Sequence, residues 1–184
     1  MFKKNIFVVG KRDYILGIDR PQVECILCTV LFGDHPGVKN LSIWEDSLLA
    51  VSANLYPYNA GHLLLFPRRH LTDIREMTDE ESLRMIQLTR HSMDILDRTY
   101  APHGYNLGYN IHDASGASIE HLHQHVIPRY PKELGFVDVV AGAKIIIEDP
   151  QVTMNKLRQA FSENPPPEFK AVKRRVKKGP TGSV

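Results

Sequence analysis

The sequence has no long apolar run and only two cysteines, and each shortage argues against a class of protein. The apolar stretch nearest the N-terminus, residues 6–9, ends at Gly10 and is too short for a secretory signal or a membrane-spanning helix. Two cysteines cannot build the disulfide framework of a small secreted protein. We therefore expect a cytoplasmic protein that does not associate with membranes.

Internal repeats and coiled-coil heptads are also missing, which leaves a globular domain. The 184 residues suffice for one domain that buries its own core, with extensions. From Asn164 onward the chain carries six basic residues and one acid, so the remainder has a formal net charge of about −3. This tail follows three prolines and has little apolar content. We expect it to be solvated rather than to recognise nucleic acid.

Three of the nine histidines alternate in one short stretch, at positions 121, 123 and 125. In a β-strand alternate side chains project from one face, so these imidazoles would form a row. The outer two would lie roughly 13 Å apart, too far for all three to bind one metal ion. The row should therefore divide its tasks. One task suited to a neutral imidazole is nucleophilic attack; the alternative is a strand whose histidines only bind metal or satisfy one another.

The hydrophobic pattern predicts strands separated by one long helix and followed by a short one. Apolar and alternating runs indicate strands at residues 41–44, 48–53, 63–66, 105–111, 119–127 and 143–147. A capping box at 78–81 begins a helix that runs to the turn at 102–104. We expect His91 to be exposed on this helix, and its apolar face to contain Leu83, Ile86, Met93, Leu96 and Tyr100. Asp149 and Pro150 begin the short helix.

Two loops carry polar groups suited to a small molecule. Asn54 begins a polar loop that runs into the strand at 63–66, and its amide could contact a sugar or base, or simply end a strand. The loop at 113–118 consists mainly of small residues, and Gly116 allows backbone N–H groups to approach an anion closely. A phosphate held there would meet the middle imidazole of the row.

Cys25 and Cys28 have the spacing that lets two thiolates bind one tetrahedral ion, or that forms a redox pair. Two ligands cannot complete a tetrahedron, so a metal would need two more from elsewhere in the chain. Buried thiols without metal are the alternative.

The stretch at 121–127 matches the pattern His-x-His-x-His-x-x, with Gln124 where an apolar residue is usual. With Asn54, the Gly61-His62 pair, the segment 67–70 and Asn110, it resembles the histidine-triad superfamily of nucleotidyl hydrolases and transferases over residues 23–163. With Cys-x-x-Cys ahead of Asn54 and the Gly61-His62 pair, the overall pattern resembles bacterial members related to diadenosine tetraphosphate phosphorylases and dinucleoside polyphosphate hydrolases. The resemblance does not cover an N-terminal arm at 1–22 or the basic tail at 164–184.

The resemblance implies an α+β fold with an antiparallel sheet of about five strands, one long helix and a short C-terminal helix. It also implies a homodimer that binds nucleotides. His123 would attack the α-phosphorus of a nucleoside polyphosphate and form a covalent nucleotidyl-histidine, which water or phosphate resolves. Charge on the phosphate oxygens would be stabilised by His125, Asn110 and Ser118. The substrate would be bound by Asn54, Gly116 and Ala117.

In zinc-bearing relatives the ligands are a Cys-x-x-Cys pair, a later histidine and the first histidine of the triad. The resemblance therefore implies one structural Zn²⁺ per chain, closed by Cys25, Cys28, His70 and His121. The alternative functions are a nucleoside phosphoramidase, a nucleotide-binding module without turnover, and a metalloenzyme that uses the histidine row directly.

Overall fold

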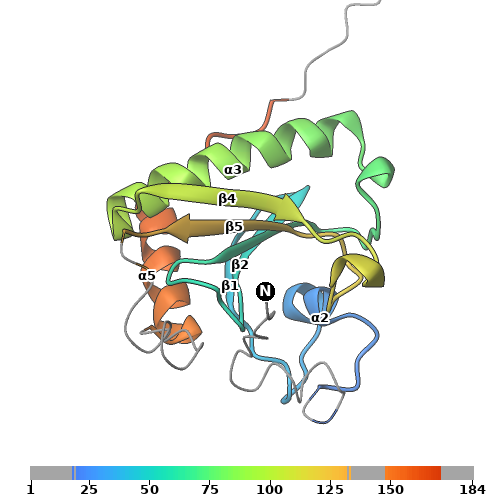
Figure 1. The fold of residues 1–184 in the computed structure, drawn as a ribbon. Helices are drawn as coiled ribbons and strands as arrows, with labels where there is room; N and C mark the ends of the chain where they lie inside the picture. The colour runs from blue at the N-terminus through green and yellow to red at the C-terminus, as the bar shows by residue number, and fades with distance from the viewer. Residues whose placement is uncertain (1–17, 19, 132, 134–147, 171–184) are drawn as a thin grey trace, which may run out of the picture.

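A five-stranded sheet with the strand order β1-β2-β3-β5-β4 forms the centre of the computed structural model, which describes residues 18, 20–131, 133 and 148–170 (Figure 1). All four strand pairs are antiparallel. The strands are β1 Ser42–Glu45, β2 Leu49–Ala53, β3 Leu63–Pro67, β4 Gly104–Tyr109 and β5 Gln124–Arg129. The helices are α2 Ile26–Phe32, α3 Asp79–Tyr100 and α5 Pro150–Glu163, with 3-10 turns η1 Ile74–Glu76 and η2 Asp113–Ser115. The predicted α+β fold is confirmed.

The sheet is covered on both faces, because alternate residues of its central strands belong to different apolar clusters. On β3, Leu63 and Leu65 pack with α3 and α5. Leu64 and Phe66 pack on the opposite face with Leu27 of α2. Every residue of β2 and β3 is therefore buried. The face with α2 is the one that concerns function, since Leu64 is paired directly with His125.

Helix α3 begins at the predicted capping box. The Thr78 side chain accepts from the Glu81 N–H, and the Glu81 carboxylate accepts from the Thr78 N–H. The predicted apolar face is rotated, because Met85, Leu88, Ile95 and Leu96 form the buried stripe while Ile86 is 60% exposed. His91 was expected to be exposed, but it is half-buried, since its ring packs against Phe161 and bonds the Asn164 carbonyl.

The predicted strand at 119–127 is shorter than expected, since β5 begins at Gln124. Residues 119–123 instead lie alongside the end of β3 and the segment after it. The Leu122 N–H donates to the Leu71 carbonyl at 2.6 Å, and the His121 ring bonds the Pro67 carbonyl. Only His125 of the three histidines is therefore a strand residue. Gln124 points to the other face, where its side-chain oxygen lies 2.5 Å from the Thr89 hydroxyl of α3.

The first residues after α5 pack against the domain. Pro166 is buried, and the guanidinium of Arg84 donates to the Pro167 carbonyl at 2.9 Å. The predicted strand at 143–147, residues 1–17 of the predicted arm and the tail from residue 171 lie outside the described residues. None of the described helices is long and apolar enough to span a membrane.

Candidate functional site

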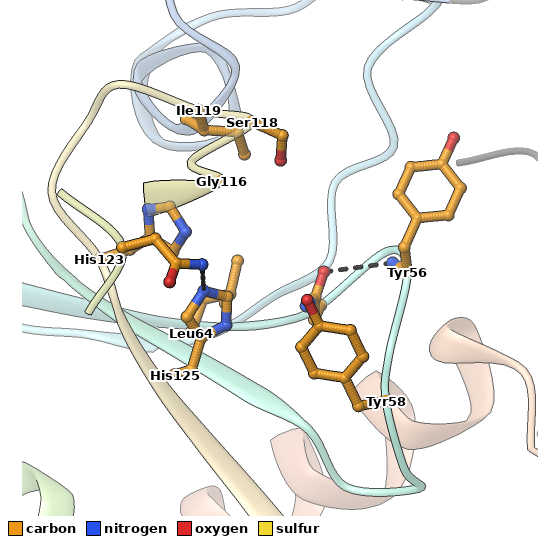
Figure 2. A pocket seen from close by; sticks show the side chains of 10 residues that line it. Tyr56, Tyr58, Leu64, Gly116, Ser118, Ile119, His123 and His125 are labelled. Atoms are coloured by element: carbon orange, nitrogen blue, oxygen red, sulfur yellow. Dashed lines mark hydrogen bonds between the residues drawn. The ribbon is translucent and has the colours of Figure 1, made fainter. Parts of the chain in front are cut away.

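A pocket opens on the face of the sheet that carries α2, and it gathers residues that are distant in the sequence. Figure 2 shows His123 and His125 at one end and Tyr56 and Tyr58 at the other, with Ser118 and Ile119 along a third side. The pocket is lined by Asn54, Tyr56, Tyr58, Leu64, Asn110, Gly116, Ser118, Ile119, His123 and His125. Six of the seven residues predicted to be catalytic or substrate-binding are in this set. Ala117 lies between two of them without lining the pocket itself.

The His123 ring has a defined orientation. It is 3% exposed, and its Nδ1 lies 2.7 Å from the carbonyl oxygen of His121. A carbonyl can only accept, so Nδ1 carries the proton and Nε2 keeps its lone pair. Burial lowers the pKa of His123, which favours the neutral ring. The side chain therefore presents an unprotonated nitrogen.

A chain of hydrogen bonds sets the tautomer of His125. The Tyr58 N–H donates to Nδ1 of His62 at 3.1 Å, so a neutral His62 carries its proton on Nε2. That nitrogen lies 3.0 Å from Nδ1 of His125, which must accept. The proton of His125 is therefore on Nε2, and the nearest Asn110 atom, at 3.4 Å, is the amide nitrogen, which is itself a donor. His125 thus offers a donor to an oxygen bound in the pocket.

His62, Tyr56 and Tyr58 were not predicted as site residues. His62 was singled out only as part of the Gly61-His62 pair, yet it is 1% exposed and stacks on the Tyr58 ring at 5.2 Å. The sequence feature that could have indicated a role for His62 is its place directly before an apolar strand. Its partner His125 is 63 residues away in the sequence, so the contact depends on the pairing of β3 with β5.

The loop between β2 and β3 is fixed to the end of β5. The buried Asn59 side chain donates to the Pro128 carbonyl at 2.6 Å and to Glu133 at 3.0 Å. Gly61 adopts a positive φ of 80°, and a Cβ there would approach Leu96 to 3.0 Å. Only glycine suits this close, left-handed position. These contacts hold Asn54 and Tyr58 in place at the pocket.

The loop at 113–118 closes the pocket from the other side. Gly116 has a positive φ of 85°, a backbone conformation that glycine adopts without strain. Its N–H donates to the Asp113 carbonyl at 2.8 Å, so this amide serves the turn rather than an anion. The Ser118 side chain is the polar group that this loop contributes to the lining.

Next to the pocket, the four predicted metal ligands come together. The ligand atoms of Cys25, Cys28, His70 and His121 lie within 4.8 Å of one another. Three sulfur-to-Nδ1 distances are 3.5 Å. A tetrahedral zinc ion with Zn–S of about 2.3 Å and Zn–N of about 2.0–2.1 Å places sulfur and nitrogen about 3.5 Å apart. The donor set and spacing therefore fit zinc.

The protein also provides outer contacts that such a cluster needs. Nε2 of His121 lies 2.9 Å from the Pro67 carbonyl, which leaves Nδ1 as the ligand atom. Burial lowers the pKa of His121 to about 4, so its ring is neutral, as a ligand must be. Sγ of Cys25 accepts from the Cys28 N–H as the N-cap of α2. The sequence had not indicated this helix.

Two named proteins are similar to the chain over more than half of its length. An AP-4-A phosphorylase of Mycobacterium tuberculosis is 33% identical over 126 residues, which are 68% of this chain and 63% of that protein. The match thus spans less than two thirds of that relative. An adenosine 5'-monophosphoramidase of Schizosaccharomyces pombe is 27% identical over 113 residues, 61% of this chain and 80% of that protein.

Solved structures share the fold. A zinc-bound histidine triad family protein from Mycobacterium smegmatis superposes with a TM-score of 0.61 at 23% identity, covering 76% of this chain and 94% of that one. A HIT family protein from Bacillus subtilis has a TM-score of 0.54 at 28% identity, covering 60% and 76%. The family model of the HIT domain matches residues 37–132, more than half of the sequence. The chain therefore belongs to the HIT domain family.

Proposed function

We propose that the protein is a nucleotidyl hydrolase or transferase that cleaves nucleoside polyphosphates, such as diadenosine tetraphosphate, at the α-phosphorus. The observation that carries the proposal is the His123 ring, which is buried, neutral and fixed through Nδ1 so that Nε2 keeps a lone pair. An activated imidazole in a pocket with hydrogen-bond donors suits covalent catalysis at phosphorus.

The reaction takes two displacements. In the first, the Nε2 lone pair of His123 forms a bond to the α-phosphorus, and the bond from that phosphorus to the bridging oxygen breaks, with its electrons leaving on that oxygen, so that the rest of the polyphosphate departs as a nucleotide. In the second, oxygen of water or of inorganic phosphate attacks the same phosphorus and the P–N bond breaks, which restores the imidazole. Water would yield a nucleoside monophosphate, and phosphate would yield a nucleoside diphosphate.

The other lining residues have roles in this scheme. His125 would donate through Nε2 to an oxygen of the α-phosphate, and Ser118 and Asn110 would add donors where charge increases. Asn54 would hold the ribose, and Leu64 and Ile119 would contact the base. Gly116, with Ala117 beside it, would let the phosphate approach the loop backbone.

The assay that tests this function mixes the protein with diadenosine tetraphosphate, with and without inorganic phosphate. AMP as product would indicate hydrolysis, and ADP formed only with phosphate would indicate phosphorolysis. His123→Ala is expected to lower kcat at least about a thousandfold, whereas His103→Ala, at an exposed histidine, should leave it unchanged. A His123→Ala rate within tenfold of wild type would contradict the proposal.

The same assay addresses the two alternative functions. Cleavage of adenosine 5'-phosphoramidate in preference to the polyphosphate would favour a phosphoramidase, the activity named for the Schizosaccharomyces pombe relative. Tight nucleotide binding with no product would favour a binding module.

We also propose that Cys25, Cys28, His70 and His121 hold one zinc ion with a structural role. Four protein ligands fill the tetrahedron and leave no position for a substrate. When bound, zinc would join the start of α2 to the segment after β3 and to the residues before β5. No step of the proposed reaction passes through the metal.

A further inference from the structure

His112 adopts a backbone conformation that is normally left to glycine. Its φ is 63° and its ψ is 172°. This region is strained for a residue that has a Cβ and is occupied almost only by glycine. A histidine at this position is therefore expected to be kept for its side chain.

The His112 side chain reaches one buried carboxylate. Its Nε2 lies 3.4 Å from Oδ2 of Asp73, whose side chain is 11% exposed. Arg75 donates to the same carboxylate through its guanidinium and its backbone N–H. These bonds, led by those from Arg75, lower the pKa of Asp73, so the carboxylate is charged and attracts the imidazole.

The contact between His112 and Asp73 can affect the pocket, because residues on both sides of His112 in the sequence line it. Asn110, two residues before it, lines the pocket and lies 3.4 Å from His125. The His112 carbonyl accepts from the Ser115 hydroxyl at 2.7 Å and so begins the turn that ends at Gly116. His112 therefore joins Asn110 to the turn that ends at Gly116, and both Asn110 and Gly116 line the pocket.

The opposite anchor, Asp73, is itself firmly placed. It caps η1 through a capping box with Glu76, and it lies two residues after Leu71, whose carbonyl accepts from the Leu122 N–H. The contact between His112 and Asp73 thus joins the loop of small residues at 113–118 to the segment whose Leu71 carbonyl accepts from the Leu122 N–H, next to His123.

We propose that His112 is a positioning residue: its contact with Asp73 holds the loop at 110–118 where the phosphoryl oxygens of a bound nucleotide need donors. The inference rests on the proposed nucleotidyl transfer. The strained backbone at His112 is the cost of this tether, and stability and activity should therefore respond in opposite directions when the side chain is removed.

The test compares His112→Gly with His103→Gly, which alters an exposed histidine at which φ is negative. We expect His112→Gly to lower kcat about tenfold with KM within about twofold, because the donors are misplaced in the transition state. Its melting temperature should equal or exceed that of the wild type. His103→Gly should keep kcat and lose a little stability. Unchanged kcat in His112→Gly, or loss that follows loss of folded protein, would overturn the proposal.

A double-mutant cycle tests the partner. Asp73→Asn should also lower kcat, and combining it with His112→Gly should give a rate no lower than that of the slower single variant. Multiplied losses would show that the two side chains act separately and would overturn the tether. Should Asp73→Asn fail to fold, the His112→Gly comparison decides alone.

Wild-type turnover tests the proposed function separately. If the wild type turns over no nucleotide, that function fails, and AMP affinity becomes the measure for His112. In that case the donors would act on the ground-state phosphate of a bound nucleotide rather than on a transition state, and we then expect about tenfold weaker AMP binding in His112→Gly than in His103→Gly. Equal affinities would overturn the inference.

Discussion

His121 contributes to two parts of the molecule at once. Its Nδ1 faces the thiols of Cys25 and Cys28, while its backbone carbonyl accepts a hydrogen bond from Nδ1 of His123. The separation of the histidines along an expected strand predicted that they would have different roles, although only His125 lies in a strand. The backbone link between the first and second histidine was not predictable, since it depends on the ring orientation of His123.

His62 gives a prediction at the same scale. In His62→Gln the carboxamide still offers an acceptor and a donor, but on a flexible chain that no longer holds them, as the ring does, against the Tyr58 N–H and Nδ1 of His125. We expect kcat to fall about a hundredfold, as when an oriented proton donor is lost, with nucleotide affinity nearly unchanged. Steady-state kinetics with diadenosine tetraphosphate measures both.

His91→Gln is the matched control, because His91 is a half-buried histidine that contacts Asn164 and Phe161 on the other face of the sheet. Its kcat should equal that of the wild type. Equal losses in both variants would mean that His62 acts only through stability.

At the scale of elements, local signals predicted the helices that begin with clear caps. Thr78 with Glu81 and Asp149 with Pro150 fixed the starts of α3 and α5. Helix α2 was missed, because a cysteine is an unusual N-cap and its seven residues are too few for a periodic pattern. The strand at 119–127 was predicted too long, because its apolar alternation continues where the backbone pairs with the segment after β3 instead.

Cys25→Ser separates the two roles of the α2 N-cap. Serine is a preferred N-cap, so the helix keeps its start, but its hydroxyl is a poor substitute for a thiolate ligand of zinc. We expect zinc affinity to fall at least about a hundredfold, with thermal stability equal to that of the metal-free wild type. Metal analysis after dialysis and thermal melts with and without chelator measure these quantities. Full zinc occupancy in Cys25→Ser would contradict the proposed ligand set.

For the molecule as a whole, the resemblance implied the α+β fold, and the apolar runs indicated where its strands lie. The resemblance named six of the residues that line the pocket, but the pocket itself needed five separated segments to meet. Leu64, Tyr56 and Tyr58 entered it for that reason. The tail at 164–184 was expected to be solvated, and its first residues proved to pack on Arg84.

The proposed homodimer can be tested at the edge of the sheet. Strand β4 is last in the strand order and presents Leu107, which is 48% exposed. Exposed edge strands pair readily with a second chain. If the chain forms the homodimer that the resemblance implies and β4 is its contact, Leu107→Lys is expected to shift the mass measured by sedimentation from dimer to monomer. Ile86→Lys, at an exposed residue of α3, is the control. A wild-type monomer would contradict the dimer.

The covalent intermediate is the central claim, and intact-protein mass spectrometry after a single turnover tests it most directly. Protein in excess over diadenosine tetraphosphate, stopped with base to preserve the P–N bond, should gain the mass of one adenylyl group. Peptide mapping should place that group on His123, and the His123→Ala protein should gain nothing. An adenylyl group on another residue, or an equal gain in His123→Ala, would contradict the account.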